Sequence, residues 1–342
     1  MREGAFTQAN FDTFLPDGRA QATFTVPWWR CGKWCKLEVE TGDRPLSIED
    51  IVLRETRYPL SVEGAFAAEG DETLAPIGRM CRRGVEMCAH EIMFDCPFYE
   101  QQMYSGDILM SFSAFRAMTR DMRLPRQALE LFDTARQPSG LLPMNWPSAV
   151  DQRSTTFTLS WVIGVGEMAR WGGSESVEWL KDRLVGVTHT LLSYARMEDV
   201  RGLLVDPPGW NFLDWVPDWM KNGGMPPNGR AGDGLDANVN LLYLRALGSA
   251  ADVAQAVGET ELAERWRKQA VRLAAAICDT FWCEERGLVA DTPAKDRFSE
   301  LAQAQAIVSD CLPPDRRARA FEGLVSASDL TRASVRAAAR ST

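Results

Sequence analysis

The stretch "DETLAPIGRMCRRGVEMCAHE", residues 71–91, decides the fold class because it is the first part of the chain with helical periodicity. Its apolar residues recur every three or four positions, which places them on one stripe of an amphipathic helix: Leu74, Ile77, Met80, Cys81, Val85 and Cys88. The same period returns downstream and predicts further helices over residues 106–120, 124–136, 155–171, 175–197, 234–257, 259–281, 297–310 and 313–326. The chain is therefore predicted to be mainly α.

The connections between these predicted helices alternate between short and long. The long ones carry strong breakers and read "QPSGLLPMNWPSAVDQ", "VDPPGWNFLDWVPDWMKNGGMPPNGRAGDG" and "EERGLVADTPAKD". Loops of this length are uncommon in a compact domain unless they are functional. The alternation predicts helical hairpins around an axis, with a site on the face that carries the long loops.

Upstream of residue 71 the sequence has a different pattern of apolar and polar residues. Residues 21–68 alternate apolar and polar positions and are rich in strand formers, as in "ATFTV" and "CKLEVE", with the turn "TGDRPLS" between strands. We predict two domains from this change: residues 1–68 as the end of an antiparallel β-domain, and residues 69–342 as the helical domain.

Composition excludes several classes of function. The 342 residues carry a net charge of -9, and the 38 Lys and Arg are scattered, which argues against a nucleic-acid partner. The chain has neither a signal peptide nor an apolar run of membrane-spanning length, so as given it reads as cytoplasmic and free of the membrane, although a segment preceding it could carry a signal. Eight cysteines and two histidines lack paired ligand spacing, so neither a metal nor a cofactor is predicted. The twelve tryptophans either stack on sugar rings in a cleft or fill the core.

The segment "MFDCPFYEQQMYSGD", residues 93–107, sets three carboxylates among aromatic side chains. Pro97 interrupts any helix through it. Asp107 stands where a helix starts, so a capping role and a functional role are both open. Glu100 lies in mid-loop, and aromatic surroundings would disfavour its ionised form. A carboxylic acid that keeps its proton can donate it to a leaving glycosidic oxygen, and the alternative is a buried structural network.

The thirteen residues "DCPFYEQQMYSGD", 95–107, resemble the acid loop of bacterial α-L-rhamnosidases. Three further segments are similar to that family. They are "CGKWCKLEVETGDRPLSIEDIVLRETRYPL", which resembles its last β-sandwich strands, "GWNFLDW" at 209–215, and "RFSELAQAQAIV" at 297–308. The resemblance covers most of residues 25–335.

This resemblance implies an (α/α)6 toroid preceded by β-sandwich strands, and hydrolysis of terminal α-L-rhamnosides with inversion. The implied partner is a rhamnose-containing oligosaccharide or glycoside, and the mechanism needs no metal. The resemblance assigns Glu100 as the general acid. It assigns the remaining site residues to the sugar, with Asp95, Asp107 and Asp214 at hydroxyl groups and Tyr104 and Trp210 as apolar walls.

Two departures from the family pattern stand out. Many members have one more residue before the acid, with an Arg that is absent here. The family's general base also follows a segment that begins here at Ala333, so we expect a chain truncated at both ends and a toroid incomplete at its C-terminus. Asp236 and Glu300 are the two alternatives as a substitute base, although a structural role suits both better. The alternatives are an impaired carbohydrate-binding remnant, or a related (α/α)6 glycosidase with another sugar specificity.

Overall fold

The computed structural model describes residues 11–67, 69–226 and 234–334. Its longer helices lie where periodicity predicts them, with ends that differ by a few residues. They are α1 (Leu74–Cys88), α2 (Ile108–Met118), α3 (Arg123–Thr134), α4 (Thr155–Trp171), α5 (Val177–Ala195), α7 (Ala237–Ala256), α8 (Thr260–Phe281), α9 (Glu300–Val308) and α10 (Pro314–Ser326). The prediction of a mainly helical hairpin fold is confirmed. The predicted helical stump after Ala333 lies almost wholly outside the described residues.

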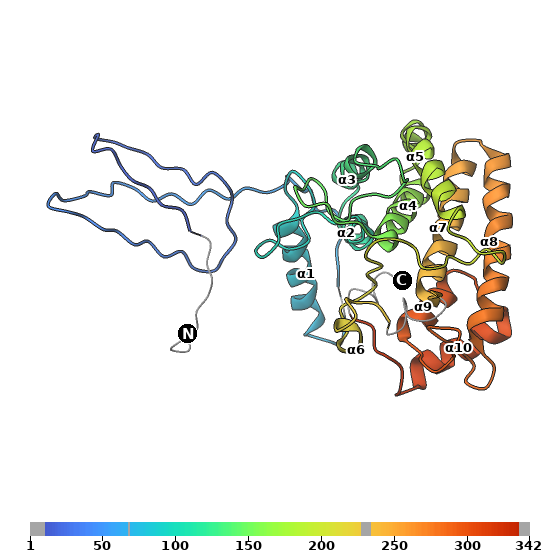
Figure 1. The fold of residues 1–342 in the computed structure, drawn as a ribbon. Helices are drawn as coiled ribbons and strands as arrows, with labels where there is room; N and C mark the ends of the chain where they lie inside the picture. Colours follow the sequence, from blue (N-terminus) through green and yellow to red (C-terminus); the bar gives the residue numbers. More distant parts are fainter. Residues whose placement is uncertain (1–10, 68, 227–233, 335–342) are drawn as a thin grey trace.

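Burial separates inner from outer helices. In α4, 13 of 17 residues are buried, and in α7, 15 of 20 are buried, whereas α8 buries six of its 22. A helix that is buried on nearly every side belongs to the interior of a helical domain, and one with a single apolar stripe belongs to its outside. The inner helices contact one another in chain order, α2 with α4, α4 with α7 and α7 with α9, while α8 lies along the outer side of α7 (Figure 1).

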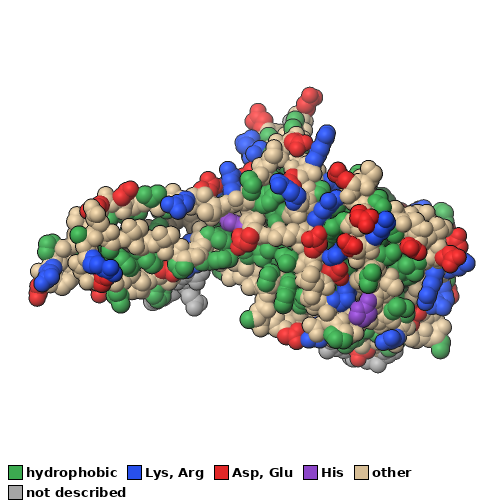
Figure 2. Space-filling view, turned by 90° about the horizontal axis from the view of Figure 1, so that it is seen from above, with side chains coloured by type: hydrophobic (Ala, Val, Ile, Leu, Met, Phe, Trp, Pro, Cys, Tyr) green, Lys and Arg blue, Asp and Glu red, His purple; other side chains and the backbone are tan. Residues whose placement is uncertain are grey.

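Residues 11–67 run as extended chain, and most of it projects away from the helices (Figure 1). Trp28, Trp29 and residues 58–64 contact the helical part. The β-sandwich strands predicted here are not seen, because none of these residues pairs in a ladder that qualifies as a strand. Apolar side chains of the alternating pattern stay exposed, with Leu37 61% and Val39 52% accessible, and Figure 2 shows such side chains along the projection. A strand needs a hydrogen-bonded neighbour, and a sandwich needs a second sheet to cover the apolar face. The division at residue 68 stays a prediction.

Two small elements, a short helix and a β-hairpin, were not predicted from the sequence. The helix α6 (Pro217–Met220) is a single turn inside the second long loop, and it is too short to show a period. The strands β1 (Trp282–Cys283) and β2 (Leu288–Val289) form an antiparallel hairpin, and Gly287 in its turn has a φ of +66°. Within the described ranges, the helices are all too short or too polar to cross a bilayer.

The close approach of α4 and α7 gives a test of this arrangement. A Cβ added to Gly166 of α4 would lie 2.5 Å from Ser249 Cβ and 3.0 Å from Ser249 Cα of α7, whereas one added to Gly248 meets nothing within 4 Å. We expect Gly166→Ala to lower the free energy of unfolding by about 1–3 kcal/mol through overpacking. The matched control Gly248→Ala should raise it by about 0.5–1 kcal/mol, because alanine is the better helix former.

Urea unfolding followed by circular dichroism measures both variants. Equal effects of the same sign from the two substitutions would contradict the packing of α4 on α7.

Candidate active site

The first part of the acid loop, residues 95–102, is closed at its base by a pair of hydrogen bonds. The backbone N–H of Asp95 donates to the carbonyl of Gln102 at 2.8 Å, and the backbone N–H of Gln102 donates to Asp95 Oδ1 at 3.0 Å. Burial raises the pKa of Asp95, and the nearby negative charge of Glu100 acts in the same direction. The half-buried carboxylate of Asp95 therefore serves as a structural clasp for the loop.

Glu100 lies at the exposed tip of this loop. The hydroxyl of Tyr104 donates to Glu100 Oε2 at 2.6 Å, and the backbone N–H of Glu100 lies 3.2 Å from Cys96 Sγ. The expectation that aromatic rings enclose Glu100 is wrong, because Tyr99 is itself 89% exposed. Residues 98–100 are exposed, and the group that contacts the carboxylate of Glu100 is the hydroxyl of Tyr104.

Tyr104 lies where the acid loop meets the loop between α3 and α4. It forms a bridge with Asn145, and the neighbouring N–H of Ser105 donates to the carbonyl of Met144 at 2.9 Å. Burial raises the pKa of Tyr104, and its hydrogen bond to Glu100 raises it further. Tyr104 therefore stays a neutral hydroxyl donor at neutral pH.

Asp107 is the residue that precedes the first turn of α2 and is half-buried. Its backbone N–H donates to the carbonyl of Tyr104 at 3.0 Å. Its side chain makes no capping hydrogen bond to the helix, and its charge lies at the positive end of the helix dipole. A role of Asp107 in binding a sugar stays a prediction.

The first turn of α4 holds the second loop, residues 208–215. Thr155 Oγ1 donates to the carbonyl of Pro208 at 2.6 Å, and Thr156 Oγ1 donates to the carbonyl of Phe212 at 2.5 Å. Both hydroxyls lie in the buried interior, where hydrogen bonds that satisfy backbone carbonyls are costly to lose. The second loop is therefore fixed to the inner helix.

A row of aromatic rings connects the two loops. Ring centroids lie 6.5 Å apart from Tyr104 to Phe157, 5.8 Å from Phe157 to Phe212 and 5.3 Å from Phe212 to Trp210. Edge-to-face contacts of this kind are favourable for aromatic pairs. They bring Tyr104 and Trp210, 106 positions apart in the sequence, into one cluster. Phe157 and Phe212 were missed by sequence reasoning, since apolar residues in a helix or loop show no functional signal.

Trp210 is only partly buried, and the indole Nε1–H donates to the carbonyl of Gly223 at 2.7 Å. Asp214, by contrast, is buried, with 1% of its surface exposed. Its two carboxylate oxygens accept hydrogen bonds from Ser334, from the backbone N–H at 2.7 Å and from the hydroxyl at 2.5 Å. The structure thus brings Glu100, Tyr104 and Trp210 together at one place. The carboxylate of Asp214 is instead hydrogen-bonded to Ser334.

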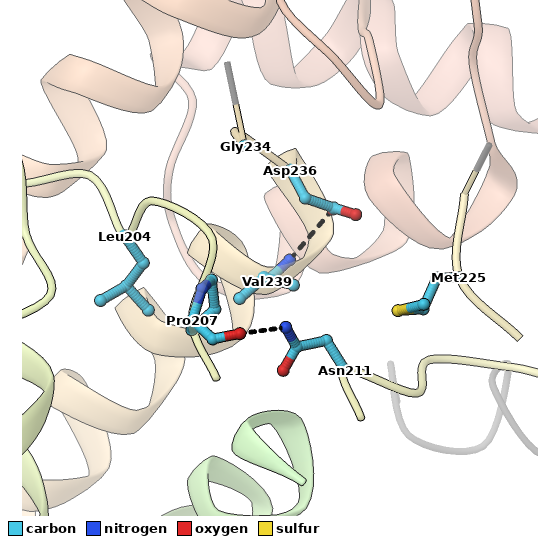
Figure 3. A pocket seen from close by; sticks show the side chains of 7 residues that line it. All are labelled: Leu204, Pro207, Asn211, Met225, Gly234, Asp236 and Val239. Carbon is cyan, nitrogen blue, oxygen red and sulfur yellow. Dashed lines mark hydrogen bonds between the residues drawn. The ribbon is translucent and has the colours of Figure 1, made fainter. Parts of the chain in front are cut away.

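The two carboxylates considered as substitute bases make structural hydrogen bonds. Asp236 caps α7 by accepting from the backbone N–H of Asn238 at 2.8 Å and of Val239 at 3.3 Å. Figure 3 shows it at a small pocket that Asn211 of the second loop also lines. Glu300 Oε2 accepts from the backbone N–H of Ala333 at 2.8 Å.

Asp236 is one of a pair of buried carboxyl groups. Burial raises its pKa to about 7, and the neighbouring charge of Asp291 contributes. Burial likewise raises the pKa of Asp291 to about 6, although its hydrogen bonds from Ser299 and Asn238 oppose the shift. In the part of the chain that the structure describes, no group of three or more His, Cys, Asp or Glu side chains is arranged to hold a metal ion.

A known family matches this chain in sequence, and solved structures resemble it in fold. The model of the bacterial alpha-L-rhamnosidase 6 hairpin glycosidase domain matches residues 64–338. A GH78 family rhamnosidase of Bacillus sp. GL1 is similar in structure, with 24% identity, a TM-score of 0.70, and coverage of 81% of this chain and 28% of the other. A rhamnosidase from Klebsiella oxytoca with rhamnose bound gives 18% identity, a TM-score of 0.67, and coverage of 78% and 50%. No curated protein of similar sequence was found.

The chain therefore spans 28% of the length of the Bacillus structure and 50% of the Klebsiella one. At these identities the structural likeness establishes the fold.

The buried pair Asp236 and Asp291 predicts how stability depends on pH. The ordinary pKa of an Asp side chain is 3.8 and that of Asp236 is about 7, so between these values the native state binds a proton that the unfolded state has lost. The proton on Asp236 therefore makes stability fall as pH rises through this window, by up to about 1.4 kcal/mol per pH unit. Asp291, with its pKa of about 6, adds a similar fall below pH 6. Asp236→Asn, which keeps a good capping side chain, should remove most of the fall that Asp236 causes.

Urea unfolding at pH 5, 6, 7 and 8 checks the slope. The exposed Asp182→Asn serves as the control and should keep the wild-type slope. An unchanged slope in Asp236→Asn would mean that the proton resides elsewhere.

Proposed function

We propose, since the chain belongs to the bacterial alpha-L-rhamnosidase 6 hairpin glycosidase family, that it hydrolyses terminal α-L-rhamnosides with Glu100 as the general acid. The observation that carries the proposal is the hydrogen bond of 2.6 Å from the Tyr104 hydroxyl to Glu100 Oε2. It fixes the orientation of the Glu100 carboxyl group and leaves Oε1 as the oxygen that can pass a proton to a glycosidic oxygen. The exposed loop tip places this oxygen where a substrate can approach.

In the proposed reaction the proton of Glu100 passes to the glycosidic oxygen as the bond from that oxygen to the anomeric carbon breaks. A water molecule adds to the opposite face of the sugar, which inverts the anomeric carbon, and a second carboxylate accepts the proton of that water. The substrate is a rhamnose-containing oligosaccharide or glycoside. Asp95 and Asp107 would bind its hydroxyls, and the partly exposed rings of Tyr104 and Trp210 would form apolar walls. Asp214 would reach the sugar only after exchanging its contact with Ser334.

A second candidate is a chain that binds rhamnose without hydrolysing it. It is favoured by the structural hydrogen bonds of Asp236 and Glu300, which occupy the two carboxylates considered as substitute bases. A related six-hairpin glycosidase with another sugar is the third, because the fold alone does not determine the sugar. Calorimetric titration with rhamnose, fucose, glucose and glucuronate separates these candidates.

The direct test is the release of nitrophenol from 4-nitrophenyl α-L-rhamnoside. Glu100→Gln should lower kcat by about 10²-fold, the low end for the loss of a general acid, because the amide has no proton to give and nitrophenolate needs less protonation than an alkoxide. The matched control is Glu91→Gln, an exposed position that precedes the acid loop, and it should keep the wild-type rate. Wild-type turnover in Glu100→Gln would overturn the role of Glu100, and rhamnose binding without turnover in the wild type would favour the second candidate.

A further inference from the structure

Gln101, the neighbour of Glu100, uses both ends of its side-chain amide. Its Nε2 donates to the carbonyl of Pro97 at 3.0 Å within the acid loop, and its Oε1 accepts from the indole Nε1–H of Trp28 at 2.7 Å. Gln101 also has a φ of +49°, a left-handed conformation that non-glycine residues adopt only when the surroundings hold it. The bond from Trp28 spans 73 positions of sequence and is such a constraint.

Trp28 is itself anchored by the residue that follows it. The ring of Trp29 stacks on His90 with centroids 4.0 Å apart and an interplanar angle of 8°, and it contacts Phe94 at 5.3 Å. His90 and Phe94 are buried between the end of α1 and the acid loop. Trp29 therefore packs the extended N-terminal segment against His90 and Phe94. This contact fixes the position of the backbone at Trp28, whose indole donates to Gln101.

The consequence for Glu100 is geometric. Its carboxylate meets Tyr104 only if the backbone turns at Gln101 in the observed direction, and a general acid displaced by about 1 Å loses much of its effect. An exposed loop tip has few contacts of its own to hold it in one conformation. We infer that Trp28 is a positioning residue for the general acid, acting through Gln101, so that the N-terminal segment completes the active site of the helical domain.

The inference rests on the proposed function, because Trp28 can position a general acid only if Glu100 is that acid. Trp28→Phe keeps an aromatic ring and removes the indole donor, and it should lower kcat on 4-nitrophenyl α-L-rhamnoside about ten-fold with little change in KM. In a Gln101→Met background the same substitution should have no further effect, because the acceptor is already gone. Trp34→Phe, a matched change in the same segment at a residue that is 85% exposed, should keep wild-type kinetics.

A second readout does not depend on turnover. Hydrogen exchange of a peptide that covers residues 95–104 should be several-fold faster in Trp28→Phe than in the wild type, while Trp34→Phe and the helices α4 and α7 exchange as before. Unchanged exchange in Trp28→Phe overturns the inference whether or not the chain is active. Faster exchange together with an inactive wild type would support the hold of Trp28 on the acid loop and count against the proposed hydrolysis. Faster exchange with an unchanged kcat would restrict Trp28 to a structural role and overturn the inference.

Discussion

The first turn of α4 is the constraint on which the site depends. Two consecutive threonine hydroxyls, Thr155 and Thr156, satisfy carbonyls of the second loop, and the next residue, Phe157, contacts the rings of Tyr104 and Phe212. Because α4 is buried on nearly all sides and lies directly against α7, this turn has little freedom to move. The first turn of α4 thus fixes the positions of both the acid loop and the second loop.

A division of tasks among the carboxylates follows from this framework. The half-buried Asp95 closes the acid loop, and the buried Asp236 caps α7, whereas Glu100 is exposed at a loop tip with a tyrosine hydroxyl on one oxygen. Buried carboxylates that accept backbone N–H groups stabilise local structure. An exposed carboxylate with one oxygen held and the other open can exchange its proton with a substrate. The acid chemistry proposed for Glu100 depends on this difference in surroundings.

Sequence reasoning predicted the helices well, because amphipathic and buried helices repeat over many residues. It also selected Glu100, Tyr104 and Trp210 together, through the resemblance of their loops to one family. It could not predict that Asp95, and not Glu100, is the half-buried carboxylate of the acid loop. The burial of Asp95 follows from its hydrogen bond with Gln102, which depends on how the loop closes. The aromatic row through Phe157 and the contact of Trp28 with Gln101 depend on tertiary packing between distant segments. The predicted strands of residues 21–68 need a paired neighbour, which a local pattern cannot supply.

The central claim is that Glu100 gives its proton to the departing oxygen, and the dependence of the rate on the leaving group tests it most directly. A nitrophenolate needs less help from an acid than an alkyl or sugar alkoxide, which requires full protonation as the bond breaks. The measurement is kcat/KM for 4-nitrophenyl and methyl α-L-rhamnoside with the wild type and Glu100→Gln. The account predicts that the substitution costs the methyl rhamnoside at least ten-fold more than the nitrophenyl one, and equal losses on the two substrates would contradict it.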